Sequence, residues 1–133
     1  MNDKIVDSDA FLGLPLAYDK TGKPISVPAA AALLPDMNAR TVEIDDVRTP
    51  TGTVLRVRTV AAVFDDVVAG GGPVPDGHEP VKWQSLLQDT EDRFLRLLDP
   101  RRFAYRRMTE ALEGHRRAVA AVRDGSVGLH GGE

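Results

Sequence analysis

Hydrophobic and polar positions alternate most clearly over residues 41–60, TVEIDDVRTPTGTVLRVRTV. A period of two predicts two half-buried strands, and the turn residues at 49–52 predict that they form a hairpin. Pairing residues whose numbers sum to 101 gathers the apolar positions on one face. That face would hold Val42, Ile44, Leu55, Val57 and Thr59.

The same register places acids opposite arginines on the other face. Glu43 would meet Arg58, and Asp45 would meet Arg56. A slip of one residue would put an arginine opposite Ile44 and mix the two faces, which is costly when one face is buried. The two arginines are therefore predicted to pair with acids across the ladder and to bind no ligand.

The spacing changes to a helical period near the C-terminus. A helix is predicted from about Met108 to Asp124, with Gly125 as its C-terminal cap. His115 falls at the centre of the apolar stripe and would face the sheet. The stripe consists of Met108, Ala111, Leu112, Ala118, Val119 and Val122.

Shorter signals precede the hairpin. The turn around Asp19 and Gly22 predicts a small hairpin of residues 14–18 and 23–27. A short helix should follow Ser26, with Pro28 in its first turn, and should stop at Pro35.

Other segments leave two interpretations open. Residues 60–69 and 80–98 fit either a strand or a helix, and the glycine- and proline-rich stretch between them predicts a loop. We expect a flexible tail at 1–10, one α+β domain at 11–125 and a disordered tail at 126–133. The domain would hold a three- or four-stranded antiparallel sheet with the C-terminal helix on one face.

Composition narrows the class of protein. The 133 residues contain no cysteine, which excludes disulfides, thiolate nucleophiles and cysteine-ligated metals. No apolar run is long enough for a membrane helix, and the N-terminus lacks the pattern of a secretory signal. We therefore expect no membrane association and a location in the cytoplasm, or in a virion if a phage encodes the chain.

Charge is divided unevenly along the chain. Residues 1–92 hold eight Lys and Arg against fifteen acids, whereas residues 93–123 hold nine Arg against three acids. Such an asymmetry indicates either an anionic partner or neutralisation of one half by the other on folding. The densest basic cluster is interleaved with aromatics and, with Trp83, is the candidate partner-binding surface. It comprises Arg101, Arg102, Phe103, Tyr105, Arg106 and Arg107.

Several short motifs occur in order along the chain: PLAYDKTGKPIS, NARTVEIDDV, VRTVAAVFDD, GGGPV and MTEALEGHRRAVAAVR. In these motifs the chain resembles short uncharacterised proteins encoded by actinobacteria and their tailed phages. The resemblance implies strands at residues 40–47, 53–65 and 81–88, a short one near 103–106, and a final helix behind them. It implies no activity. The chain departs from the pattern at Gln84, where a glutamate is usual, and at Asp66, where a histidine is frequent.

His115 is the main candidate for chemistry. A buried histidine needs a hydrogen-bond partner, and Thr59, Asp65, Gln84 or a backbone carbonyl could supply one. Gly114 beside it predicts close contact with a strand or side chain. The alternative is a general base or metal ligand acting with Asp65. Asp65, Gln84 and His115 therefore form a candidate polar site, and the structural interpretation of His115 is preferred.

Other chemistry finds less support. Neighbouring carboxylates at Asp45-Asp46 and Asp65-Asp66 point to opposite faces of a strand, so neither pair predicts a metal site. His78 lies in a loop without partner spacing, and no nucleophile or phosphate-binding motif is present. We assign no catalytic residue, cofactor or metal.

Three functions remain, in order of preference. The first is a small non-enzymatic protein-interaction module, phage- or mobile-element-derived, that binds another protein or itself as an assembly component or modulator of a host protein. The second is a nucleic-acid-associated protein that uses the arginines of 101–107. The third is a small metal-dependent hydrolase built around Asp65 and His115.

Overall fold

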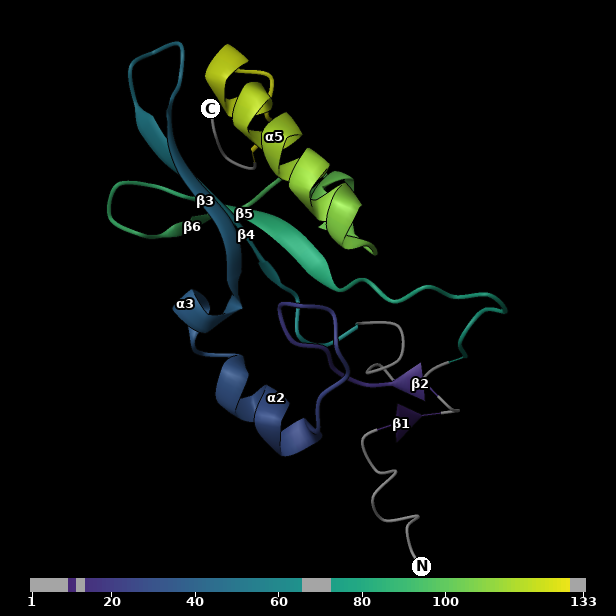
Figure 1. The fold of residues 1–133 in the computed structure, drawn as a ribbon. Coiled ribbons are helices and arrows are strands. Elements are labelled where there is room, and N and C mark those ends of the chain that lie inside the picture. The colour runs from purple at the N-terminus through teal and green to yellow at the C-terminus, as the bar shows by residue number, and fades with distance from the viewer. Residues whose placement is uncertain (1–9, 12–13, 66–72, 130–133) are drawn as a thin grey trace, which may run out of the picture.

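The computed structural model describes residues 10–11, 14–65 and 73–129 of the chain. Its centre is an antiparallel sheet in the order β3-β4-β5, with β6 and β7 both paired to the far edge of β5. A long helix, α5, lies against one face of this sheet (Figure 1). The elements are β3 (Thr41–Arg48), β4 (Val54–Ala61), β5 (Trp83–Gln88), β6 (Phe94–Leu95), β7 (Ala104–Tyr105) and α5 (Met108–Asp124).

This arrangement confirms the predicted α+β fold. The two segments that fitted both a strand and a helix contain strands: β4 ends at Ala61, and β5 and β6 lie within 80–98. Residues 66–72, which hold Asp66 and the start of the predicted glycine loop, lie outside the described residues. A 3-10 helix, η2 (Pro100–Phe103), leads into β7.

The predicted register of the β3–β4 hairpin is wrong by one residue along most of its length. Only Thr41 and Val60 pair as predicted, and beyond a bulge between Thr41 and Glu43 the pairs shift. Ile44 lies opposite Arg58, and Ile44 is 45% exposed. Asp46, not Asp45, lies opposite Arg56.

The turn explains this shift. Thr49 N–H donates to Thr53 O, and Gly52 N–H donates to Thr49 O, so Thr49 and Thr53 close a three-residue loop. Gly52 has a φ of 93°, the left-handed conformation that ends such loops and that glycine adopts without strain. The glycine at the third loop position thus sets the register. The slip costs little because the side chain of Arg58 keeps polar partners on the face that Ile44 occupies.

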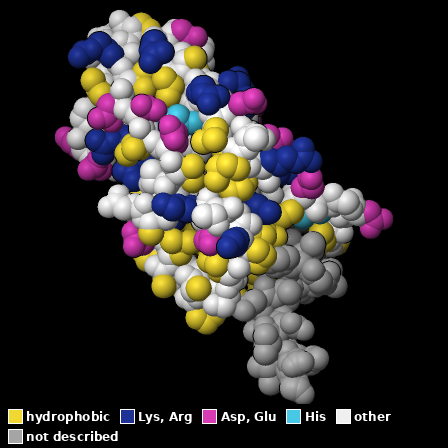
Figure 2. Space-filling view, viewed as in Figure 1, with side chains coloured by type: hydrophobic (Ala, Val, Ile, Leu, Met, Phe, Trp, Pro, Cys, Tyr) yellow, Lys and Arg dark blue, Asp and Glu magenta, His cyan; other side chains and the backbone are white. Residues whose placement is uncertain are grey.

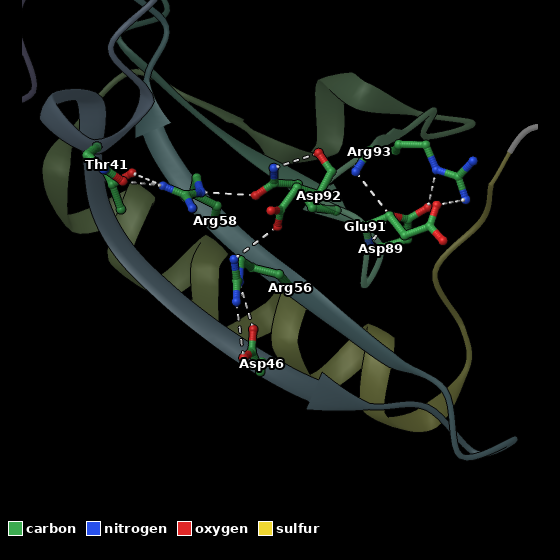
Figure 3. A network of polar contacts seen from close by, with 10 residues as sticks. Thr41, Asp46, Arg56, Arg58, Asp89, Glu91, Asp92 and Arg93 are labelled. Atoms are coloured by element: carbon green, nitrogen blue, oxygen red, sulfur yellow. Dashed lines mark hydrogen bonds and ion pairs between the residues drawn. The ribbon is translucent and has the colours of Figure 1, made fainter.

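The face of the sheet opposite α5 is covered by a polar network (Figure 3). Arg56 bridges two carboxylates, with Nε 2.9 Å from Asp46 Oδ1 and Nη1 3.2 Å from Asp92 Oδ1. Arg58 donates to Gln88 Oε1 and to Thr41 Oγ1, and Glu43 lies opposite Thr59 instead, so the predicted pair of Arg58 with Glu43 does not form. An antiparallel sheet tolerates solvent on one face, and these side chains satisfy one another there.

The N-terminal segment packs at the lower end of the sheet in Figure 1. It contains β1 (Ala10–Phe11), β2 (Leu14–Pro15), α2 (Val27–Leu33) and α3 (Met37–Arg40). The predicted turn is present, because Gly22 N–H donates to Asp19 O and Asp19 N–H donates to Lys23 O. Of the two predicted strands, 14–18 keeps β2, which pairs with β1, and a single bridge, Tyr18 with Pro24, joins 14–18 to 23–27.

The helix α2 begins as predicted. Ser26 Oγ accepts a hydrogen bond from Ala29 N–H at 3.2 Å, and Pro28 occupies the first turn. Arg40, at the end of α3, is a buried link to the sheet. Its guanidinium donates from Nε to Ala61 O at 3.0 Å and from Nη1 to Leu34 O at 2.8 Å.

The main core lies between the sheet and α5, and a smaller one lies under α2. The smaller core consists of Ala17, Ala30, Ala61 and Val63 with three flanking side chains. The main core is built from β3, β4, β5, η2, β7 and the inner stripe of α5. Its buried members are Val47, Leu55, Val57, Trp83, Leu87, Phe103, Tyr105, Ala111, Ala118 and Val122.

The bounds of α5 match the prediction. Gly125 caps the helix in the left-handed conformation, with its N–H directed at the carbonyls of Ala121 and Val122. Gly114 faces β7, and a Cβ at that position would overlap the ring of Tyr105. The glycine therefore lets the helix approach the strand, as the sequence indicated.

Residues 126–129, the described part of the predicted C-terminal tail, contact the rest of the domain. Leu98 N–H donates to Gly128 O at 2.9 Å, and Leu97 forms a bridge with Leu129. Val127 and Leu129 pack against the main core. The tail therefore adds apolar contacts to the core that the glycine-rich sequence around it did not suggest.

Candidate interaction surface

His115 starts a chain of hydrogen-bonded side chains that crosses the core. Its Nδ1 lies 2.7 Å from Thr59 Oγ1, and Thr59 Oγ1 lies 2.6 Å from Ser85 Oγ. Ser85 Oγ in turn lies 2.9 Å from the Tyr105 hydroxyl. At the other side of the ring, Nε2 lies 2.8 Å from Asp45 Oδ2. Four strands and α5 each contribute one residue.

The donors in this chain all point toward Asp45. A carboxylate only accepts hydrogen bonds, so His115 Nε2 carries a proton and donates to it. In the neutral ring Nδ1 then accepts from Thr59, which accepts from Ser85, which accepts from Tyr105. Burial raises the pKa of Tyr105, which keeps its hydroxyl protonated as the first donor. The opposite order would leave the Tyr105 proton without an acceptor among the described residues.

This arrangement joins α5 to the sheet through hydrogen bonds of the buried His115. His115 is 2% exposed, and both ring nitrogens are occupied. Thr59, the hydroxyl that a histidine–aspartate pair could activate, is fully buried and cannot meet a substrate. The prediction of a buried, hydrogen-bonded histidine is confirmed, with Thr59 as one of its predicted partners and Asp45 as one that the assumed register concealed.

The other members of the candidate polar site lie elsewhere. Asp65 is 1% exposed and accepts from Val81 N–H at 2.9 Å, and its Oδ2 lies 2.8 Å from His78 Nε2. Asp65 is thus bonded to His78, to which the sequence assigned no partner, and His115 is bonded to Asp45. Gln84 lies on β5 opposite Val60 and Ala104, and both ring nitrogens of His115 are taken by Thr59 and Asp45. The structure does not assemble the site around Asp65 and His115.

An open groove of about 370 Å³ lies beside Asp45, between the edge strand β3 and α5. Its strand wall is formed by Glu43, Asp45, Asp46 and Val47. Its helix wall is formed by the flank of α5, where positions three or four residues apart lie on one side. Those residues are Leu112, His115, Arg116, Val119 and Arg123.

The groove combines charge of both signs with apolar surface. Val47, Leu112 and Val119 line it, and the side chain of Asp45 is 53% exposed even though it holds His115. Figure 2 shows acidic, basic and apolar side chains intermixed on the viewed face over the end of the molecule where α5 lies. Such a surface lacks the single-sign potential that attracts nucleic acid.

β3 is an edge strand, and β4 is its single ladder partner within the part of the chain that the structure describes. In an antiparallel ladder, hydrogen-bonded pairs alternate with pairs that are not hydrogen-bonded. Thr49 and Thr53 form a hydrogen-bonded pair, so Val47–Leu55 and Asp45–Val57 are hydrogen-bonded pairs as well. The backbone groups between them point the other way. The N–H and C=O of Ile44, Asp46 and Arg48 are therefore directed away from β4, at the edge of the sheet.

The predicted partner-binding cluster does not form one surface. Trp83, Phe103 and Tyr105 are 3%, 6% and 2% exposed, so their rings belong to the core. Trp83 also donates from Nε1 to Lys20 O at 2.9 Å. These three residues were predicted to contact a partner, and their burial removes them from any surface that this conformation presents.

The arginines of the cluster are exposed, and two of them are bound within the chain. Arg106 donates from Nε to Glu79 O, and Arg107 Nη2 lies 3.0 Å from Glu79 Oε2. Arg102 lies over the ring of Phe103, with 5.6 Å between guanidinium carbon and ring centroid, and Arg101 is exposed on η2. Without exposed aromatic rings, the cluster has no platform on which bases could stack.

No group of three or more His, Cys, Asp or Glu side chains that could hold a metal ion occurs in the described ranges. Asp45 and Asp46 point to opposite faces of β3, one toward His115 and one toward Arg56. Within the described ranges, no helix is long and apolar enough to cross a lipid bilayer.

The edge of β3 is the feature that sequence reasoning missed. The strand contains the run Glu43-Ile44-Asp45-Asp46, which is typical of an ordinary half-buried strand until its neighbours are known. One signal in the sequence could have indicated this edge. The predicted strand at 41–48 contains three acids and no lysine or proline, and the predicted C-terminal helix has apolar residues on the flank next to it. No protein-family model, curated protein or solved structure matches the chain.

Proposed function

We propose that this protein is a small non-enzymatic interaction module that binds an extended polypeptide segment along the edge of β3. One observation carries the proposal: an eight-residue edge strand borders a groove of about 370 Å³ whose other wall is a helix. An added strand would pair with the outward backbone groups of Ile44, Asp46 and Arg48. Its alternate side chains would enter the groove.

In strand addition of this kind, the main chain and the side chains of the bound segment have different roles in recognition. Main-chain hydrogen bonds supply affinity, and side-chain pockets next to the edge supply specificity. Here Leu112 and Val119 offer apolar contacts, and the charged rim would select against a wholly apolar segment. Exposed edges are often blunted by proline, lysine, a bulge or a covering loop. β3 has a bulge between Thr41 and Glu43 but no proline or lysine, so the edge beyond the bulge supports a binding role.

The resemblance to proteins of actinobacteria and their tailed phages supports a more specific version. In it, the module is phage- or mobile-element-derived and acts in the host cytoplasm or in the virion, as an assembly component or as a modulator of a host protein. The partner-binding role moves from the arginine cluster to the β3 edge, because the aromatic rings of that cluster are buried.

The test is selection of extended peptides from a random display library. Wild-type protein would be immobilised at low density, so that copies do not meet. Selected peptides should shift the amide NMR signals of 44–48 and of the helix flank 112–123. Ile44→Pro should abolish their binding, because proline removes the outward N–H of Ile44 while the hydrogen bonds to β4 come from its neighbours.

Ile44→Thr is the matched control. It keeps the N–H, the β-branched shape and the strand propensity, so it should bind selected peptides within a few-fold of wild type. Both variants must retain the circular dichroism spectrum of the wild type. Peptides that bind Ile44→Pro as well as wild type, or that shift signals away from β3 and α5, would refute edge binding.

A further inference from the structure

We infer that the segment that occupies the β3 edge is β3 of a second copy, paired antiparallel so that Asp46 of each copy lies opposite Arg48 of the other. This inference rests on the proposed function and names its partner. The result would be a two-fold dimer with one continuous sheet and with both copies of α5 on the same face.

The outward backbone groups restrict the register. Hydrogen-bonded pairs across the new edge must join residues that both point outward, which are Ile44, Asp46 and Arg48. A pairing between identical strands therefore places even-numbered residues opposite even-numbered ones. The bulge between Thr41 and Glu43 further confines regular pairing to the C-terminal part of β3.

Charge then distinguishes the remaining registers, because like charges directly opposite each other destabilise a strand pair. A two-fold axis at Asp46 or at Arg48 would oppose each of these residues to its own copy. An axis at Asp45 would do the same to that carboxylate, and an axis at Ile44 would oppose Glu43 to Asp45 twice. An axis at Val47 alone opposes an acid to an arginine, and it does so twice.

Both charged side chains are accessible for this contact. Asp46 and Arg48 are exposed on the face opposite α5. Asp46 already accepts from Arg56, with 2.9 Å between Oδ1 and Nε, and its side chain remains 56% exposed. A carboxylate has room for further donors. Arg48 donates from Nη1 to Gly52 O within its own turn, a bond that leaves its other donors unassigned.

The groove is better suited to a second copy than to a partner of one charge. An interface with two-fold symmetry brings a patch against itself, so the patch must be self-complementary. The groove and the adjoining strand hold the acids Glu43, Asp45 and Asp46 and the bases Arg48, Arg116 and Arg123. Equal numbers of both signs meet that requirement.

The experiment uses the absence of native cysteine. Asp46→Cys and Arg48→Cys would be prepared as separate proteins, and oxidation of each alone would be compared with oxidation of their mixture. Residues in a hydrogen-bonded antiparallel pair have Cα atoms about 5.5 Å apart, within the range that a disulfide spans. The inferred register opposes position 46 to position 48, so the mixture should form disulfide-linked dimers far faster than either protein alone.

Ala32→Cys, exposed on α2, gives the background rate of collision. Rapid cross-linking of Asp46→Cys with itself would overturn the register, since it places the axis at Asp46. Rates at background for all mixtures, together with a monomeric mass in sedimentation equilibrium at millimolar concentration, would overturn the dimer.

A charge variant tests the same contact without a cross-link. Arg48→Glu would place glutamate opposite Asp46 at both pairs and should weaken self-association by about tenfold or more. Arg101→Glu, on η2 and remote in sequence, changes the net charge equally and should leave the mass distribution unchanged. Equal loss in both variants would refute the pairing. If no dimer forms but selected peptides still bind the β3 edge, the second copy is the wrong occupant; if neither binds, the proposed function also fails.

Discussion

Asp45 Oδ2 lies 2.8 Å from His115 Nε2, across seventy positions of sequence, and joins the edge strand to the centre of α5. The contact places a half-exposed carboxylate at one end of a buried chain of hydroxyl groups. It also forms the floor of the groove next to the β3 edge. The same residue pair thus fixes the helix on the sheet and shapes the surface that we propose binds a second strand.

Among the hydrogen-bonded side chains around His115, the hydroxyl of Thr59 is expected to contribute most to the free energy of unfolding. Thr59→Val keeps the shape and leaves both His115 and Ser85 without their buried partner, so we expect a loss of about 2–3 kcal/mol in the free energy of unfolding. Thr59→Ser retains the hydroxyl and should lose about 1 kcal/mol for one methyl group. Urea unfolding of both variants measures the difference. Equal stability of the two variants would mean that the hydrogen bonds contribute nothing.

The direction of the donors predicts a single tautomer of His115. Because Asp45 accepts from Nε2, the neutral ring should carry its proton there, with Nδ1 unprotonated. Long-range ¹H–¹⁵N correlation spectra distinguish the two nitrogens directly. His78, whose Nε2 faces Asp65, gives an internal comparison in the same spectrum. A protonated Nδ1 in neutral His115 would contradict the order of donors.

Gly114 is expected to tolerate no side chain. In most helices Gly→Ala stabilises by about 1 kcal/mol, but here the new Cβ would overlap the Tyr105 ring. We expect Gly114→Ala to lower the free energy of unfolding by about 1–3 kcal/mol, as other overpacked cores do. In a Tyr105→Leu background the penalty should shrink, because the ring that causes it is gone. An unchanged penalty there would place the clash elsewhere.

The sequence predicted elements better than it predicted contacts. The bounds of α5 and the cap at Gly125 followed from helical spacing, and the α+β class followed from the order of the elements. These features depend on residues close together in the chain. The hairpin register failed because it was chosen to keep Ile44 inside, whereas the loop ending at Gly52 determines it locally.

The hydrogen-bonded group around His115 depends on that register, so only part of it could be predicted from the sequence. A buried His115 could be inferred from the apolar stripe alone, with Thr59 as one of four candidate partners. Asp45 could not, because the assumed register sent it to the opposite face of the sheet. The same limit applies to Trp83, Phe103 and Tyr105: alternation cannot show whether an aromatic next to arginines faces the core, and burial against α5 decided it.

Both tyrosines should resist ionisation while the protein is folded. Burial raises the pKa of Tyr105 above its ordinary value of 10.0, and burial together with the nearby Asp65 raises the pKa of Tyr18. A group whose folded pKa is raised contributes stability that is present below its unfolded pKa and is lost as the pH rises through the folded value. Stability should therefore fall above about pH 10. Absorbance at 295 nm should show ionisation later in native protein than in denatured protein, and coincident curves would contradict this.

Val63 supplies a prediction that reverses the usual order of two substitutions. It is 1% exposed with a φ of 74°, a left-handed conformation that costs a residue with a Cβ about 1–2 kcal/mol. Val63→Ala and Val63→Gly both lose the buried methyl groups, but only glycine also releases the backbone strain. We expect the glycine variant to be at least as stable as the alanine variant in urea unfolding. At Val57, buried in the middle of β4 without a positive φ, alanine should be the more stable by about 0.5–1 kcal/mol. If the alanine variant were more stable than the glycine variant by the same margin at both positions, the backbone at Val63 would carry no strain. The sharp turn that leads from β4 toward Asp65 would then need another explanation.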